Sequence, residues 1–153
     1  MKKFELTSEF VTFLGKKLFR IKALISFGNV KEGELGGYVE KEENLSNDGD
    51  AWVSGNARVY GNAWVSGDAR VYGNAWVYGN ADYATVHGFG SEYRTTTFFK
   101  TKAGDIGVRC GCFYGTLEEF RAKVKETHGE IKTAKEYLMV ADLMEFRFSK
   151  EEV

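Results

Sequence analysis

A strict six-residue repeat runs through the middle of the chain. Residues 51 to 81 read AWVSGN ARVYGN AWVSGD ARVYGN AWVYGN A, so Ala-x-Val-x-Gly-Asn/Asp occurs five times in succession. Ala and Val alternate with larger residues, which predicts short strands that point Ala and Val to one side and Trp, Arg, Ser and Tyr to the other. Each Gly-Asn or Gly-Asp pair predicts a corner. This repeat favours a tightly wound parallel β-solenoid, in which equivalent residues stack on successive coils.

The residues on the outer side distinguish between possible coil lengths. They repeat every twelve residues as Trp52, Arg58, Trp64, Arg70 and Trp76. In an eighteen-residue coil of three hexads, Trp52 lies beside Arg70 and Arg58 beside Trp76, about 4.8 Å apart. Such cation–π pairs contribute roughly 0.5 to 1 kcal/mol. A twelve-residue coil would instead stack Arg58 on Arg70, which is unfavourable. The pattern therefore predicts three sides per coil, and an antiparallel meander with Gly-Asn turns is the competing architecture.

The solenoid is predicted to occupy residues 35–82, about three coils. Counting back in sixes places Leu35 and Val39 at inward positions, and Leu45 fits the next coil loosely. A core of Val and Ala alone is narrow and holds no ligand cavity. Both open ends of so short a stack need a cover. We assign residues 1–34 to an N-terminal β-hairpin cap and residues 83–153 to a C-terminal module.

The flanking segments carry hairpin and helix signals. Alternating apolar residues before and after Gly15-Lys16 predict a hairpin that turns there. Residues 93–101 and 106–113 predict a second hairpin around a turn at 102–105. Thr116 and Glu119 form a capping box for a helix that ends at His128-Gly129, and Thr133 and Glu136 suggest the same start for a second helix. The C-terminal module is thus predicted to be ββαα, with apolar helix faces covering the last coil.

The fold class is therefore mainly β, and composition limits the function. The formal net charge of -1 gives no global electrostatic footprint for nucleic acid or an anionic membrane. No apolar run approaches the roughly 20 residues that span a bilayer, and the first residues lack a signal-peptide core. We therefore expect a cytoplasmic protein with reduced thiols, without membrane association and without a cofactor.

The outward aromatic and arginine residues form the most specific predicted surface. Trp, Tyr and Arg are enriched at interaction hot spots. The surface is predicted to bind a protein partner or a second copy of the chain, with stacked nucleic-acid bases ranked last because the charge balance is neutral. Self-stacking ladders that only stabilise the repeat are the alternative. The predicted surface consists of Trp52, Arg58, Tyr60, Trp64, Arg70, Tyr72, Trp76 and Tyr78.

Cys110, Cys112 and His128 are the candidate metal ligands, with His87 as a further candidate. On one continuous strand the two cysteines would point to the same face, and two thiolates with two imidazoles could make a tetrahedral zinc set. Cys-x-Cys is not the usual two-residue-spaced metal knuckle, however. Buried packing of the cysteines under the helices is the favoured interpretation. For His128 the favoured interpretation is a structural one: its imidazole stands at a helix C-terminus, where the helix dipole stabilises positive charge.

Several motifs resemble known repeat proteins. The spacing of Val53 with Ala57 and Val59 with Ala63 resembles the hexapeptide repeat of left-handed β-helix proteins. Residues 35–40 (LGGYVE), 44–46 (NLS), 95–98 (TTTF) and 110–113 (CGCF) resemble a group of hexapeptide-repeat proteins from phages and prophages. The resemblance spans essentially the whole chain and implies a short left-handed β-helix in a mobile-element setting.

The resemblance to hexapeptide β-helix proteins suggests two enzyme classes as candidate functions. Hexapeptide acyltransferases use a histidine base beside a loop extruded from a coil, but the clear repeats contain neither. The γ-type carbonic anhydrases bind zinc through three histidines, and the chain has His87 and His128 only. We therefore expect a non-catalytic phage or prophage binding protein, with an acyltransferase-like enzyme or a zinc or thiol site as the alternative.

The expected partner is a bacterial protein or a small signalling ligand in the cytoplasm of the host cell. By analogy with phage accessory proteins, the chain could inhibit or sequester a defence component. Trimeric hexapeptide proteins suggest a homo-oligomer, dimer or trimer.

Overall fold

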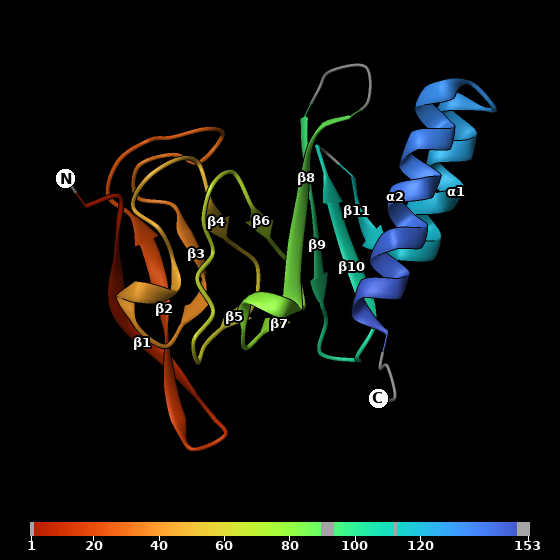
Figure 1. Ribbon diagram of the computed structural model, residues 1–153. Coiled ribbons are helices and arrows are strands. Elements are labelled where there is room, and N and C mark those ends of the chain that lie inside the picture. Colours follow the sequence, from red (N-terminus) through yellow and green to blue (C-terminus); the bar gives the residue numbers. More distant parts are fainter. Residues whose placement is uncertain (1, 90–93, 112, 150–153) are drawn as a thin grey trace.

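The computed structural model describes residues 2–89, 94–111 and 113–149. Figure 1 shows an N-terminal hairpin, a stack of short strands, a twisted sheet and a pair of helices, arranged side by side in chain order. The strands are β1 (Phe4–Phe13), β2 (Lys16–Ala23), β3 (Leu35–Val39), β4 (Trp52–Val53), β5 (Arg58–Val59), β6 (Arg70–Val71), β7 (Trp76–Val77), β8 (Tyr83–Phe89), β9 (Arg94–Lys100), β10 (Ile106–Cys110) and β11 (Phe113–Thr116). The helices are η1 (Glu42–Asn44), η2 (Asn80–Asp82), α1 (Leu117–His128) and α2 (Lys132–Phe148).

The repeats pair in parallel with the segment one coil later. Trp52 lies opposite Arg70 in β4 and β6, and Arg58 lies opposite Trp76 in β5 and β7. Both pairs are eighteen residues apart, so the predicted spacing is confirmed and the antiparallel meander is wrong. Earlier in the region the spacing is twenty residues, as in the bridge between Leu45 and Val65. We call residues 35–82 the coil region.

Small side chains fill the inside of the coil region. Every inward Val from Val53 to Val77 is fully buried, as are Ala51, Ala57, Ala69 and Ala75. Val39 and Leu45 lie inside as predicted, but Leu35 is 53% exposed because it stands at the start of β3, before the stacked positions. Asn44 is also buried and donates through Nδ2 to Ala63 O (2.8 Å), which satisfies its amide inside the stack.

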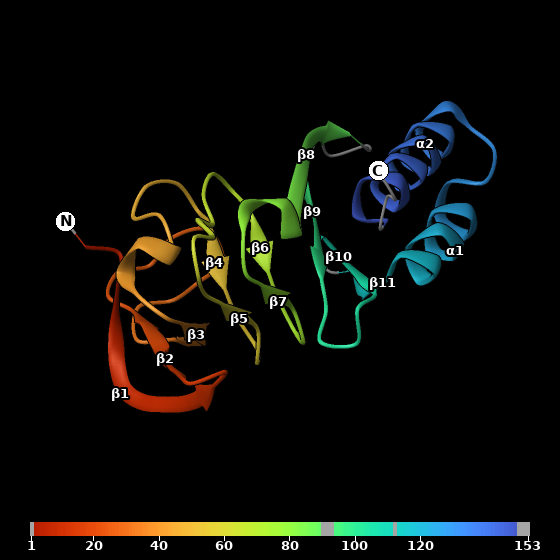
Figure 2. The same cartoon turned by 60° about the horizontal axis from the view of Figure 1, so that its bottom comes forward.

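The predicted N-terminal hairpin is present and closes one end of the coil region. β1 and β2 pair antiparallel and turn at Leu14-Gly15. β2 pairs with β3, which gives a mixed sheet in the order β1-β2-β3-β5-β7. Phe4, Ile21 and Ala23 join the coil core. Figure 2 shows the hairpin bending beneath the coil region.

The C-terminal module has four strands before its helices, so the predicted ββαα order is wrong. The sheet order is β11-β10-β9-β8. β8 follows the last repeat after only the short helix η2, and no strand was predicted for its residues. β10 ends at Cys110, which pairs with Phe113 at the start of β11, so the predicted strand 106–113 is a hairpin. Tyr93 and Cys112, which the predicted strands include, lie outside the described residues.

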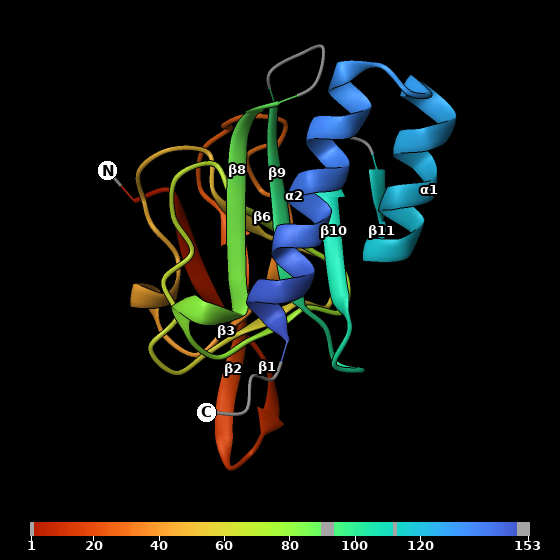
Figure 3. The ribbon, with the colours of Figure 1, turned by 45° about the vertical axis from the view of Figure 1, so that its right-hand side comes forward.

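The four-stranded sheet, and not the helices, covers the last coil. Phe99 of β9 belongs to the coil core, whereas its neighbour Phe98 packs with Phe120 of α1. Thr101, just after β9, pairs with Ala75 of the coil region. Figure 3 shows both helices on the other face of this sheet. The prediction that the helices cover the coil is wrong because a strand buried on both faces lies between them.

The two helices follow the sequence signals unequally. α1 begins after the predicted capping box, in which Glu119 N–H donates to Thr116 Oγ1 (3.2 Å), and it ends at His128. α2 begins at Lys132 after the N-cap Ile131, so the predicted start at Thr133 is wrong. Its buried residues are Ala134, Tyr137, Val140, Ala141 and Met144. Among the described residues, neither helix combines the length and the apolar character that a membrane crossing requires.

Candidate functional site

The predicted aromatic and arginine surface is divided among different sides of the coil region. The pairing places Trp52 with Arg70 on one ladder and Arg58 with Trp76 on another. Trp64 lies on neither, because its neighbour Val65 bridges to Leu45. The eight residues therefore do not form one continuous stripe, since three successive hexads face three directions.

Two of the predicted surface residues are buried. Trp52 is only 2% exposed because the Phe27 ring covers it edge-on at 5.3 Å, and its Nε1–H has no hydrogen-bond partner among the described residues. Tyr60 is also buried, with Phe13 at 5.1 Å. The expectation that every outward ring faces water is wrong for these two, because the N-terminal segment folds back over them.

Arg70 and Tyr72 lie where the coil region meets the C-terminal sheet. The Tyr72 ring contacts Tyr114 of β11 edge-on at 4.7 Å, and the Arg109 guanidinium of β10 lies 4.5 Å from its centre. Arg70 donates through its backbone N–H to Thr97 Oγ1 of β9 at 2.9 Å. These residues therefore take part in the internal joint between two modules.

The remaining aromatic and cationic residues form a surface with the tip of the β1–β2 hairpin. The Phe13 ring lies 4.6 Å from Trp76 and 4.8 Å from the Arg58 guanidinium, which also lies 5.7 Å from Trp76. The expected Arg58–Trp76 cation–π contact is thus confirmed. The Tyr78 ring packs at a tilt against the buried Tyr60 ring, with centroids 5.2 Å apart, and is approached by the Lys16 ammonium at 6.0 Å. We call this surface the hairpin-tip patch; it consists of Phe13, Leu14, Lys16, Arg58, Trp76 and Tyr78.

The hairpin-tip patch presents apolar groups to solvent on a supported base. Leu14 is 75% exposed and Tyr78 is 56% exposed, while Phe13, Arg58 and Trp76 are half-buried. Leu14 also adopts a positive φ of 51°, which is unusual for a residue with a side chain. Sequence reasoning placed Arg58, Trp76 and Tyr78 on the surface but missed Phe13, Leu14 and Lys16. The adjacent apolar pair at a hairpin turn was the available signal.

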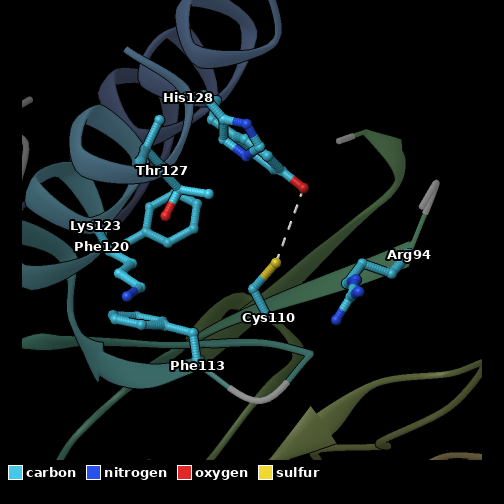
Figure 4. Close-up of a pocket in the computed structure, with 9 residues that line it drawn as sticks. Arg94, Cys110, Phe113, Phe120, Lys123, Thr127 and His128 are labelled. Atoms are coloured by element: carbon cyan, nitrogen blue, oxygen red, sulfur yellow. Dashed lines mark hydrogen bonds between the residues drawn. The ribbon is translucent and has the colours of Figure 1, made fainter. Parts of the chain in front are cut away.

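A second candidate is a small pocket between the C-terminal sheet and the helices. Figure 4 shows Cys110 of β10 and Arg94 of β9 on one side, with Phe120, Lys123, Thr127 and His128 of α1 on the other. The pocket has a volume of about 240 Å³, below the range of about 300 to 1,000 Å³ that is usual for small-molecule sites. Cys110 and His128, predicted as possible metal ligands, both line it.

Tyr137 of α2 separates the thiol from the imidazole in this pocket. Cys110 Sγ lies 3.9 Å from Tyr137 Oη and accepts from Thr96 Oγ1 at 3.2 Å, while the His128 ring stacks on the Tyr137 ring at 6.1 Å. Burial, reinforced by Cys110, raises the pKa of Tyr137 to about 12. The hydroxyl therefore stays protonated and donates to Phe89 O at 3.1 Å. Between the described residues Cys110 and His128 no hydrogen bond forms, so the pocket lacks the nucleophile–base contact of thiol catalysis.

The predicted zinc set is not assembled by the described residues. No group of three or more His, Cys, Asp or Glu side chains with metal-site geometry occurs among them. His87 instead pairs through Nδ1 with Thr95 Oγ1 at 2.8 Å, on the β8–β9 ladder. Cys112, the remaining predicted ligand, falls outside the residues described, so its part in a site stays a prediction.

The comparison with protein families agrees with the repeat architecture. Residues 51–67 and 65–79 match the family model described as the YdcK β-solenoid repeat. The chain contains β-solenoid repeats. The matched segments correspond to the hexads from Ala51 onward and end before β8, so the resemblance to this family concerns the coil region. No curated protein matches the chain significantly.

Proposed function

We propose that the protein is a non-catalytic binding protein that engages a bacterial protein through the hairpin-tip patch. The observation that carries this proposal is the exposure of Leu14 and Tyr78 on a base of packed rings and cations. Single exposed apolar residues are ordinary on protein surfaces, but a cluster beside Trp, Tyr and Arg has the composition of an interaction hot spot.

The packing beneath the patch favours binding by reducing its entropic cost. Trp76 and Arg58 are already held by Phe13, and Tyr78 by Tyr60. A partner therefore does not need to immobilise these side chains, each of which would otherwise cost about 0.5 to 1.5 kcal/mol to order. Arg58 supplies positive charge beside the rings, whereas the Lys16 ammonium pairs with Glu40 at 3.5 Å. The patch therefore suits a protein surface with a carboxylate that can approach Arg58.

We further propose that the coil region is a left-handed hexapeptide β-helix and that the protein originates from a phage or prophage. The support is the hexad itself and the resemblance of residues 35–40 and 110–113 to phage proteins. In this setting the protein would act in the cytoplasm of the host cell, where it would inhibit or sequester a defence component.

The test of partner binding uses two surface variants, one altered in the hairpin-tip patch and one altered on another side of the coil region. Immobilised native protein, Leu14→Ser/Tyr78→Ala and Trp64→Ala are each incubated with bacterial lysate, and retained proteins are quantified by mass spectrometry. Trp64 is 52% exposed on another side of the coil, so its variant is a matched control. We expect proteins enriched by native protein and Trp64→Ala to fall about tenfold or more with the double variant. Equal recovery by all three proteins, or no enrichment by any, would contradict the proposal.

The expected homo-oligomer has a separate candidate surface on α2. Met139, Leu143 and Phe146 are exposed and follow one another at helical spacing on its outer side. An antiparallel contact with the same helix of a second copy would bury these side chains symmetrically. Light scattering should report a dimer for native protein, as this two-fold contact requires, and a monomer for Leu143→Glu. A native monomer would contradict this part of the proposal.

A further inference from the structure

A cavity of about 450 Å³ lies where three parts of the chain meet. Asn29 comes from the loop before β3, Asp50 and Asp68 from corners of the coil region, and Arg109 from β10. The volume falls within the usual range for small-molecule sites. The cavity shares no lining residue with the hairpin-tip patch, so a ligand bound in it would be independent of the proposed function.

Two arginines, Arg70 and Arg109, bring positive charge into this cavity. Arg70 is half-buried and donates through Nη1 to the neutral Asn29 side chain, while Arg109 lies over Tyr72. Within the described residues, no carboxylate oxygen lies within 4.0 Å of either guanidinium. Burial and, secondly, the nearby charge of Arg109 lower the pKa of Arg70, and the carboxylates of Asp50, Asp68 and Glu34 offset only part of this shift. A bound anion would relieve both effects.

Two aspartates lie in the same cavity at equivalent positions of the repeat. The corner position holds Asn at 56, 62, 74 and 80, but Asp at 50 and 68. These two are one coil apart and stack directly, with Asp50 N–H donating to Asp68 Oδ1 at 3.3 Å. Like charges on adjacent strands are unfavourable, and Asn satisfies this corner elsewhere. The buried Lys3 ammonium donates to Ala51 O at 2.7 Å and interacts with both carboxylates only through charge attraction. The sequence thus departs from its repeat where a polar cavity forms.

Glycines make room for the guanidinium groups around the cavity. A Cβ on Gly28 would lie 2.7 Å from Arg70 Nη2, and a Cβ on Gly111 would overlap the Arg94 guanidinium. Arg94 also lines the cavity. The guanidinium groups of Arg70 and Arg94 therefore lie directly against glycine backbone, which places their positive charge inside the joint between modules.

We propose that this cavity binds a small phosphate ester that also carries hydroxyl or amino groups, of which a nucleotide is the representative class. Arg70 and Arg109 would receive the phosphate, because guanidinium groups bind phosphate oxygens through paired hydrogen bonds. Asp50 and Asp68 would accept hydrogen bonds from sugar hydroxyl or base amino groups. An anion that lacks such donor groups could not form these hydrogen bonds. The size of the cavity and the net charge of -1 favour a small ligand over a nucleic-acid strand.

The experiment measures binding of AMP, adenosine and inorganic phosphate to the full chain by isothermal titration calorimetry at low ionic strength. The variants are Arg70→Gln, Arg109→Gln and Asp68→Asn, and Arg147→Gln on the exposed end of α2 is the charge-matched control. Circular dichroism confirms that each variant folds. We expect AMP to bind more tightly than phosphate or adenosine, and each cavity arginine variant to weaken AMP binding about tenfold or more.

The variants separate the two halves of the proposed site. Asp68→Asn should reduce the preference for AMP over phosphate, whereas Arg147→Gln should change neither affinity. In a ¹⁵N-labelled sample, AMP should shift the amide signals of Thr95 and Gly111, which line the cavity. The proposal is overturned if AMP does not bind at millimolar concentration, or if its affinity is the same in both cavity arginine variants as in native protein. AMP affinity no higher than that of phosphate would overturn the assignment to phosphate esters.

Discussion

The coil region and the C-terminal module reach buried cores by opposite routes. Strands of only two residues build most of the coil region, and its core consists mainly of Val and Ala stacked in parallel. The module uses four antiparallel strands and two helices around Phe, Tyr and Met side chains. Repetition thus allows small side chains to fill the core, because equivalent residues of successive coils stack on one another. Without repetition, the module depends on a few large side chains.

The two regions meet at β9, whose alternate residues belong to different cores. Phe98 faces the helices and Phe99 faces the coil, and both are fully buried. A single strand thereby closes the open end of the stack and supports the helices. This arrangement allows the comparison to be tested by changing one residue at a time.

The largest expected effect comes from removing either phenylalanine of β9. Phe98→Ala and Phe99→Ala should each lower the free energy of unfolding by about 3 to 5 kcal/mol, because each leaves a cavity in a packed core. Hydrogen exchange should distinguish them. Phe99→Ala should deprotect backbone amides around Ala75 and Val77 first, and Phe98→Ala those of α1. If both variants deprotect the same residues to the same extent, the regions unfold as one unit and the contrast between them fails.

A smaller effect is expected at the corners of the coil region. Gly61 and Gly67 have φ values of 64° and 65°, so alanine at either position costs about 1 to 2 kcal/mol of backbone strain. A Cβ on Gly61 would also lie 2.7 Å from Tyr78 O, whereas no atom lies within 4 Å of that position at Gly67. Overpacking adds roughly 1 to 3 kcal/mol. Urea unfolding should therefore rank Gly61→Ala below Gly67→Ala, and equal stabilities would show that the coil tolerates the crowding.

The same contrast explains which features could be predicted from the sequence. The hexad specified the stacking of Trp52 with Arg70 because periodicity determines neighbours without any knowledge of the rest of the chain. It could not predict that Phe27 would bury Trp52, since that contact depends on how a non-repeated loop folds back. β8 and β11 were missed because their pairing is stabilised by neighbouring strands and no local motif marks them. The hairpin-tip patch and the arginine cavity are likewise built from segments that lie far apart in the chain. The sequence therefore could not show which of their residues come together.

In the C-terminal module, alkaline pH is expected to lower the free energy of unfolding by about 2 kcal/mol. Tyr137 has a pKa of about 12 in the folded protein against a reference of 10.0. Folding therefore gains stability from the protonated hydroxyl below pH 10, and this gain is lost as pH rises from 10 to 12. Tyr137→Phe should be less stable at pH 8, having lost its hydrogen bond, but should lose less stability between pH 10 and 12. Chemical denaturation at each pH measures this, with the exposed Tyr78→Phe as control. Parallel pH profiles for native protein and Tyr137→Phe would contradict the assignment.

The smallest effect is expected at the ion pairs that join the two helices. Arg121 of α1 contacts Glu118, and also Asp142 and Glu145 of α2 at 2.8 and 2.9 Å. The three carboxylates are largely exposed, so water and salt screen the attraction even though the contacts raise the pKa of Arg121. Arg121→Gln should therefore lower stability by about 1 kcal/mol or less, and the difference should shrink in 1 M salt. A larger, salt-independent loss of stability would show that the helices depend on charge pairing more than on the aromatic core beneath them. The packing of Phe98 against Phe120 would then not be the main interaction that stabilises the module.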